Sequence, residues 1–155
     1  MAADNENEYE PSPAKWVRDQ VRLIEESGGT KGTSAGGKPV ILLTMRGAKS
    51  GLIRKVPLMR IEHDRRYVAV GSNGGSVKPP AWVANLLAGP RVTLQDGPER
   101  LEVVARLLAG DERAEWWERA VEGFRYYAGY QKKVARELPV FLLEPMEPSE
   151  SESPE

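Results

Sequence analysis

Residues 47–58 are the most chemically suggestive stretch of this sequence, a basic, glycine-bounded segment between two apolar runs. Its cations are Lys49, Arg54 and Lys55. Glycine lets a backbone approach a phosphate closely, and an arginine fork binds an anion through two parallel hydrogen bonds. The stretch is not the phosphate loop of nucleotide hydrolases, because no Gly-x-x-x-x-Gly-Lys-Ser/Thr motif is present. We expect an anion-binding turn here, with an ordinary basic surface hairpin as the alternative.

A second polar loop, residues 71–80, is rich in glycine and leads into an expected helix that begins at Ala81. A glycine-rich loop followed by a helix N-terminus is suited to bind anions and carbonyl groups, although an ordinary connecting loop is the alternative. Two such loops at the ends of neighbouring strands together predict one groove for a long, acidic ligand with a planar head. Trp82 could form a wall against that head, or could simply be part of the core.

A pair of tyrosines, Tyr127 and Tyr130, lies three residues apart in an expected helix, which places both on one face. Such phenols can hydrogen-bond a substrate carbonyl or donate a proton to it. Packing of the helix against the rest of the protein is the alternative for each of them.

The composition narrows the classes of protein. The chain has 155 residues, enough for one domain with its own core, and its net charge of −1 gives no electrostatic reason to expect nucleic-acid binding. It has no cysteine and a single histidine, His63, so we expect no metal site and no thiol chemistry. No apolar run reaches the roughly 18 residues of a membrane-spanning helix, and the N-terminus lacks a signal-peptide core, so we expect a cytoplasmic protein.

Four segments follow from the hydrophobic pattern. Residues 1–13 are expected to be an acidic, disordered N-terminus, residues 14–27 a helix, residues 28–145 the folded domain and residues 146–155 a disordered tail.

Within the domain, hairpin-linked strands dominate. The expected strands are 40–45, 58–62, 66–70, 91–95, 100–105 and 140–144, and the expected helices are 81–87 and a long one that is capped by Asp111 and breaks near Gly129. This order predicts a mainly β protein with helices (α+β), in which a mostly antiparallel sheet closes into a small barrel.

Three motifs combine into a specific resemblance. They are Thr44-x-Arg46-Gly47-x-Lys49-Ser50-Gly51-x-x-Arg54-x-x-Pro57-Leu58, then Gly71-Ser72-Asn73-Gly74-Gly75 with Pro80-Ala81-Trp82-x-x-Asn85-Leu86, and finally Tyr127-x-x-Tyr130-Gln131. The chain resembles the deazaflavin-dependent nitroreductase and quinone reductase family, actinobacterial enzymes that use the deazaflavin coenzyme F-420. The resemblance implies a split six-stranded antiparallel β-barrel with flanking helices.

The resemblance also implies a role for individual residues. The positions that match coenzyme-binding segments are Ala48, Lys49, Ser50, Arg54, Lys55, Val56, Pro57, Val70, Gly71, Ser72, Asn73, Lys78, Ala81, Trp82, Val83, Ala84, Asn85 and Tyr127. Lys49 and Arg54 would be the principal cations for the phosphate and the glutamyl tail. Tyr127, Tyr130 and Ser72 would act on the acceptor, a planar electron-poor molecule such as a quinone, an enone or a nitroaromatic, which takes hydride from the reduced coenzyme.

Some positions depart from the family's pattern. Ala48 stands where some relatives have Arg, and Asn73 where some have Lys, which predicts a weaker hold on the tail. Phe124 replaces a tyrosine and Met59 an aromatic residue, which leaves the acceptor open. Two alternatives therefore stand beside a reductase: a non-catalytic carrier or sensor of F-420, and a flavin-mononucleotide-binding protein on the same barrel.

The helix expected at residues 14–27 has Lys15, Arg18 and Arg22 beside its apolar stripe. This pattern is compatible with weak contact to the inner face of a membrane, with packing against the barrel as the alternative. The oligomeric state does not follow from the sequence.

Overall fold

The computed structural model describes residues 8–146. The expected disorder of residues 1–7 and 147–155 therefore concerns parts of the chain outside the described residues.

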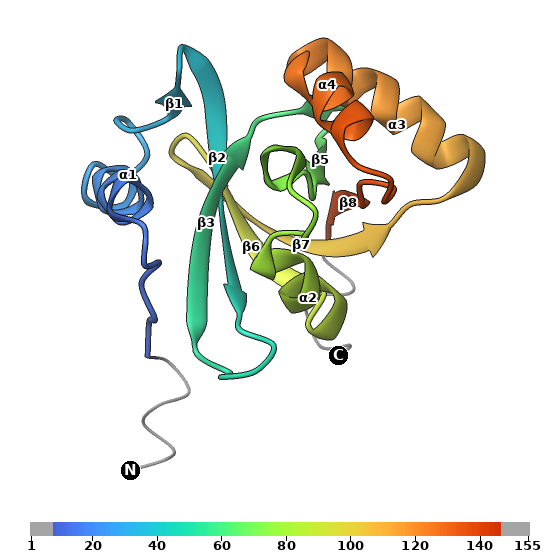
Figure 1. Cartoon of the computed structure of the whole chain (residues 1–155). Coiled ribbons are helices and arrows are strands. Elements are labelled where there is room, and N and C mark those ends of the chain that lie inside the picture. The colour runs from blue at the N-terminus through green and yellow to red at the C-terminus, as the bar shows by residue number, and fades with distance from the viewer. Residues whose placement is uncertain (1–7, 147–155) are drawn as a thin grey trace, which may run out of the picture.

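One curled sheet of antiparallel strands forms the body of the protein (Figure 1). Its strands are β1 (Ser34–Ala35), β2 (Lys38–Arg46), β3 (Ile53–Met59), β4 (Glu62–His63), β5 (Arg66–Val70), β6 (Arg91–Asp96), β7 (Glu99–Leu107) and β8 (Val140–Pro145). They follow the order β1-β2-β6-β7-β8-β5-β4, and β3 pairs with β2. The sheet curls into an incomplete barrel, which confirms the expected mainly β, split-barrel fold with flanking helices.

Helices cover separate parts of this sheet (Figure 1). They are α1 (Lys15–Glu26), the short 3-10 helix η2 (Asn73–Gly75), α2 (Ala81–Ala88), α3 (Gly110–Gly123) and α4 (Tyr126–Lys133). Helix α1 lies beside β3, whereas α3 lies against β5 and β8 and α4 lies beside η2. Within residues 8–146, none of the helices combines the length and the apolar character needed to cross a membrane.

Successive side chains of β2 point to opposite faces of the sheet, so they contribute to an inner and an outer part of the hydrophobic core. Ile41 packs inside the barrel with residues such as Phe141, and both are at most 1% exposed. Leu42 points to the opposite face and packs against Val21 and Ile24 of α1. The apolar stripe of α1 is therefore used for packing on the sheet.

Strand β3 begins earlier than the sequence predicted. Residues 53–57, expected within the basic turn, instead pair with β2. The Ile53 N–H donates away from β2, to a carbonyl oxygen of the N-terminal segment at 2.8 Å, so alternate residues of β3, Pro57 included, turn their backbone nitrogen away from β2. Pro57 therefore costs the ladder no hydrogen bond, and a proline that suggested a turn is compatible with a strand at the sheet edge.

The break in the C-terminal helical segment lies between α3 and α4, not near Gly129 as expected. A Cβ on Gly123 would come within 2.5 Å of the Ile61 Cδ1, so a larger residue where α3 ends would require the Ile61 side chain to move. Gly129 lies inside α4 with open space around it. The expected cap also differs, because Ala109 is the N-cap and Asp111 lies in the first turn, where its charge complements the helix dipole.

Residues 8–13, which we call the N-terminal arm, lie against the domain although they were expected to be disordered. The Glu10 N–H donates to the Ile53 carbonyl oxygen, and the Ile53 N–H donates to the Glu8 carbonyl oxygen, both at 2.8 Å. Tyr9, between them, packs against the hydrophobic cluster under α1. Two backbone hydrogen bonds and one aromatic anchor thus order a segment whose composition is acidic and proline-rich.

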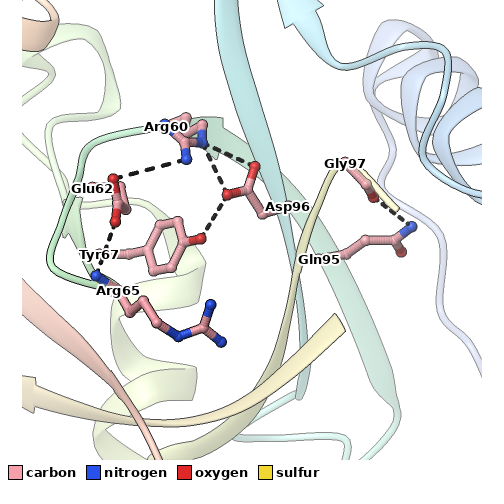
Figure 2. A network of polar contacts seen from close by, with 7 residues as sticks. All are labelled: Arg60, Glu62, Arg65, Tyr67, Gln95, Asp96 and Gly97. Atoms are coloured by element: carbon pink, nitrogen blue, oxygen red, sulfur yellow. Dashed lines mark hydrogen bonds and ion pairs between the residues drawn. The ribbon is translucent and has the colours of Figure 1, made fainter. Parts of the chain in front are cut away.

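A polar network ties the segment between β3 and β5 to β6 (Figure 2). The Arg60 Nε donates to both carboxylate oxygens of Asp96 at 2.9 Å, and the Tyr67 hydroxyl donates to the same carboxylate at 2.6 Å. Burial, and then the hydrogen bond to Asp96, raise the pKa of Tyr67, so its phenol is a protonated donor at neutral pH. Because β3 and β5 stand far apart in the strand order, these bonds hold together a part of the barrel that strand pairing does not close.

Candidate functional site

The turn between β2 and β3 is fixed by helix α2. Gly51 adopts a φ of +73°, which glycine tolerates best, and its N–H donates to the Gly47 carbonyl oxygen at 2.9 Å. The Ala48 N–H donates to Oδ1 of the buried Asn85 at 2.8 Å. An amide side chain of α2 therefore sets the position of a turn that lies 37 residues earlier in the chain.

A pocket of about 650 Å³, which we call the cationic pocket, opens between this turn and α2. Its walls are formed by Glu10, Gly47, Ala48, Lys49, Ser50, Arg54, Pro79, Pro80, Ala81, Val83, Ala84, Asn85 and Leu87. Lys49 and Arg54 bring positive charge to it, and α2 begins at its wall with the partial positive charge of a helix N-terminus. The pocket is suited to an anionic group.

A second pocket of about 450 Å³, which we call the aromatic pocket, lies next to the first. Its walls are formed by Trp16, Val17, Val56, Pro57, Leu58, Met59, Val70, Ser72, Asn73, Gly74, Pro80, Trp82, Phe124, Tyr127 and Tyr130. The ring of Phe124 has its centroid 4.9 Å from that of Tyr127 and 6.3 Å from that of Tyr130. Pro80 belongs to both pockets, so the two adjoin; together we call them the groove, with a cationic and an aromatic end.

The loop between β5 and α2 is held by one guanidinium that the sequence analysis did not identify. Arg136 donates to main-chain carbonyl oxygens of this loop at distances between 3.0 and 3.5 Å, and its acceptors are those of Gly71, Ser72, Ser76 and Lys78. The Lys133 ammonium adds a bond to the Gly74 carbonyl oxygen at 3.2 Å. No local pattern marks Arg136 for this role, because its partners lie some 60 residues earlier in the chain.

Three hydroxyl groups line the aromatic pocket, those of Ser72, Tyr127 and Tyr130. Ser72 is 8% exposed and Tyr127 is 6% exposed. Within residues 8–146 these hydroxyls make no hydrogen bond to another protein group. Burial, and then the neighbouring Tyr130, raise the pKa of Tyr127, so its phenol is a protonated donor at neutral pH. The pocket therefore offers hydrogen-bond donors to the oxygen of a bound molecule.

The structure brings most of the predicted site residues into this groove. The cationic pocket contains Ala48, Lys49, Ser50, Arg54, Ala81, Val83, Ala84 and Asn85, and the aromatic pocket contains Val56, Pro57, Val70, Ser72, Asn73, Trp82, Tyr127 and Tyr130. Lys55, Gly71 and Lys78 lie outside both pockets. Lys55 points to the other face of β3, where it pairs with Glu25 of α1.

Residues of the N-terminal region reach the groove and were missed as site residues. Glu10 lines the cationic pocket, while Trp16 and Val17 line the aromatic one. Trp16 is 65% exposed, because the buried positions of the helix are Val21 and Ile24. The spacing of apolar residues correctly predicted a helix here. Which of those residues are buried and which face the groove depends on how α1 packs on the sheet, and the sequence does not show this.

The fold is a curled half-barrel of the split-barrel class, and its adjoining cationic and aromatic pockets are suited to a ligand that has an anionic and a planar part. The family described as F420H(2)-dependent quinone reductase matches residues 16–145. A Mycobacterium tuberculosis protein with this activity in its name is 34% identical over 107 residues, which cover 69% of this chain and 90% of the relative. A second protein of that organism, named F420H(2)-dependent quinone reductase, is 32% identical over 111 residues, or 70% of this chain and 74% of the relative.

Two solved structures are also similar to this chain in sequence and in fold. One described as an F420-H2 dependent reductase, FDR-A, is 48% identical with a TM-score of 0.65, covering 68% of this chain and 94% of the other. Another, described as a domain-swapped dimer, is 47% identical with a TM-score of 0.68, covering 86% of this chain and 100% of the other. The chain belongs to the F420H(2)-dependent quinone reductase family. It is therefore an oxidoreductase whose cofactor is F-420.

The groove fits this cofactor on its own geometry. F-420 joins a planar deazaflavin ring to a phosphate and an acidic glutamyl tail. The cationic pocket presents Lys49 and Arg54 to a tail, and the adjoining aromatic pocket presents apolar walls and hydroxyl donors to a ring. The cations of one pocket and the apolar walls and hydroxyl groups of the other thus suit the two halves of the coenzyme.

Proposed function

We propose that this protein transfers hydride from reduced F-420 to a planar, electron-poor acceptor, with quinones as the principal acceptors and enones and nitroaromatics as further ones. The observation that carries the proposal is the joined groove, in which the cationic pocket and the aromatic pocket meet at Pro80. A ligand with an anionic tail and a planar head can fill both ends at once.

In this proposal the cationic pocket binds the phosphate and the glutamyl tail. Lys49 and Arg54 neutralise their charge, and an arginine can hold two oxygens of one anion. Asn85 keeps the turn in place through the Ala48 N–H.

The aromatic pocket would bind the deazaflavin ring beside the acceptor. Bound F-420 supplies the hydride, while the side chains of the pocket orient the acceptor and exclude water. One hydride and one proton convert a quinone into its hydroquinone, and negative charge develops on the acceptor oxygen as the hydride arrives. The hydroxyl of Tyr130, Tyr127 or Ser72 donates a hydrogen bond to that oxygen, and the proton comes from one of these groups or from solvent.

A binding experiment followed by a single-turnover experiment tests the proposal. Oxidised F-420 should raise the melting temperature, because a ligand selective for the native state stabilises it, whereas flavin mononucleotide and nicotinamide cofactors should not. Mixing the enzyme and reduced F-420 with menadione should then restore the absorbance of the oxidised coenzyme within one rapid phase. Tight F-420 binding without this oxidation would identify a carrier, and a shift with flavin mononucleotide alone would reject the coenzyme assignment.

We also propose a cytoplasmic location with weak contact between α1 and the inner face of the membrane. Its support is the exposure of Trp16 and Leu23, at 65% and 45%. The opposing observation is that Lys15 and Arg22 are paired with Asp19. Co-sedimentation with anionic vesicles, lost in Trp16→Ser, would support the contact, and equal sedimentation of both proteins would reject it.

A further inference from the structure

A carboxylate of the protein itself lies in the cationic pocket. One oxygen of Glu10, Oε1, is 3.3 Å from a terminal nitrogen of Arg54 and accepts a hydrogen bond from the Ser50 hydroxyl, also at 3.3 Å. A carboxylate oxygen between a guanidinium and a hydroxyl is in the environment that a phosphate or glutamate oxygen would occupy. Glu10 thus engages the cation that the proposed function assigns to the coenzyme tail.

The N-terminal arm fixes the position of the Glu10 carboxylate through several contacts with the domain. The backbone hydrogen bonds of Glu10 and Glu8 to Ile53 align the arm with β3. Tyr9 anchors it, with its ring 4.7 Å from the Lys55 ammonium and its side chain in the cluster under α1. The residue that follows this anchor is therefore held beside Arg54.

The pairing is strong enough to compete with a ligand and weak enough to be exchanged. The side chains of Glu10 and Arg54 are 43% and 30% exposed, so their attraction is screened by water. An anionic tail that reaches Arg54 must displace the Glu10 carboxylate or remain close to it, and either event lowers the affinity for that tail.

We propose that Glu10 is a specificity-determining residue that competes with the anionic tail of the coenzyme for Arg54 and Ser50. The inference rests on the proposed function, because it assigns the tail to the cationic pocket. Its consequence is selective: Glu10 weakens ligands in proportion to the negative charge that they bring to this pocket, and it leaves the ring end of the groove unaffected.

The test compares Glu10→Gln with the parent protein, using equilibrium binding of oxidised F-420 and of the deazaflavin chromophore without phosphate and glutamates. Glu10→Gln should bind F-420 roughly two- to fivefold more tightly, the range expected for removing one screened ion pair. The gain should be absent with the truncated chromophore and should shrink at high salt. Glu8→Gln is the matched control, because it removes one negative charge from the same arm at an exposed residue outside the pocket wall.

A second pair of variants shows whether the effect passes through Arg54. In an Arg54→Met background, Glu10→Gln should no longer tighten F-420, since the cation over which both anions compete is gone. Unchanged or weaker F-420 binding in Glu10→Gln, or an equal gain with the truncated chromophore, would overturn the inference and leave the proposed function intact. Absence of F-420 binding in the parent and in Glu10→Gln alike would reject the proposed function and this inference with it.

Discussion

Two tyrosines of α4 face the same pocket but differ in their surroundings. Tyr127 is 6% exposed and packs edge-on to Phe124, whereas Tyr130 is partly exposed at the pocket wall. A buried phenol contributes packing as well as a donor, while a phenol at the wall can be removed with little effect on the core. Tyr130 is therefore the better residue with which to separate chemistry from stability.

Tyr130→Phe should lower kcat with quinone acceptors by on the order of ten- to a thousandfold while F-420 affinity stays nearly unchanged. The reason is that a hydrogen bond formed mainly as charge develops contributes to the transition state and not to coenzyme binding. Steady-state kinetics with menadione and a binding titration measure the two effects. Tyr126→Phe is the control on the same helix, because Tyr126 is 66% exposed and lies outside the pocket wall.

Parent-like turnover in Tyr130→Phe would assign catalysis to Tyr127, Ser72 or solvent. Loss of F-420 affinity in the same variant would instead place Tyr130 against the coenzyme. The pH profile gives a further check, since the raised pKa of Tyr127 keeps that phenol protonated throughout the neutral range. Tyr127 should therefore introduce no inflection there.

Residue types and short spacings were enough to predict most residues of the groove. Residues that act on distant parts of the chain could not be predicted in this way. Lys49, Arg54 and the tyrosine pair were visible in the sequence because glycine-bounded cations and a three-residue spacing have local meaning. Arg136 and Glu10 were not visible, since each acts on a segment at least 40 residues away that only the fold brings close. Lys55 was predicted as a ligand-binding cation, but strand alternation turns it toward α1.

At the scale of elements, the loop between β5 and α2 depends on the segment before β8. Arg136→Gln should destabilise the protein by about 1–3 kcal/mol, because several loop carbonyl groups lose a charged donor. It should also weaken the truncated chromophore as much as intact F-420, since Ser72, one of the residues that Arg136 holds, lines the aromatic pocket, and none of the carbonyl groups that it holds belongs to the wall of the cationic pocket. Chemical unfolding and the two binding titrations measure these effects.

Lys132→Gln supplies the comparison for Arg136→Gln, because Lys132 is an exposed cation of the neighbouring helix. If Arg136→Gln weakened the binding of intact F-420 but not of the truncated chromophore, the result would contradict a role of Arg136 in positioning the loop. Such a result would mean that Arg136 contributes mainly long-range positive potential.

The elements themselves were predicted well where one local signal was sufficient. The Asp96-Gly97 turn and the apolar runs around it identified β6, β7 and their hairpin. The boundary of β3 and the helix break were displaced, because Pro57 and Gly129 were given their usual local meaning. The structure instead ends α3 at Gly123, which lies close to Ile61, a residue distant in the sequence.

At the scale of the whole molecule, closure of the barrel rests on the Arg60, Tyr67 and Asp96 network. Asp96→Asn should lower the free energy of unfolding by about 1–2 kcal/mol, since it replaces the acceptor of a charged pair and of a buried phenol. Urea unfolding followed by tryptophan fluorescence measures the loss. The expected loss is small because the Arg60 side chain is 37% exposed and water screens the pair.

Glu99→Gln provides the contrast for Asp96→Asn. Its partner is Arg65 at 3.0 Å, but both side chains are largely exposed, so the change should stay within about 0.5 kcal/mol. Equal effects of the two substitutions would show that the network adds no more than a surface ion pair.

The pairing of the arm with β3 also bears on how an exposed edge of the sheet is covered. A strand with unpaired N–H and C=O groups is a template on which a second copy can add a strand and begin aggregation. Here the N–H and C=O groups of Ile53 are both hydrogen-bonded to the arm. Pro57, whose nitrogen also faces away from β2, has no N–H group to donate. The arm therefore covers the edge of β3 at Ile53, and a truncation that removes residues 8–13 would expose these backbone groups while it frees Arg54 from Glu10.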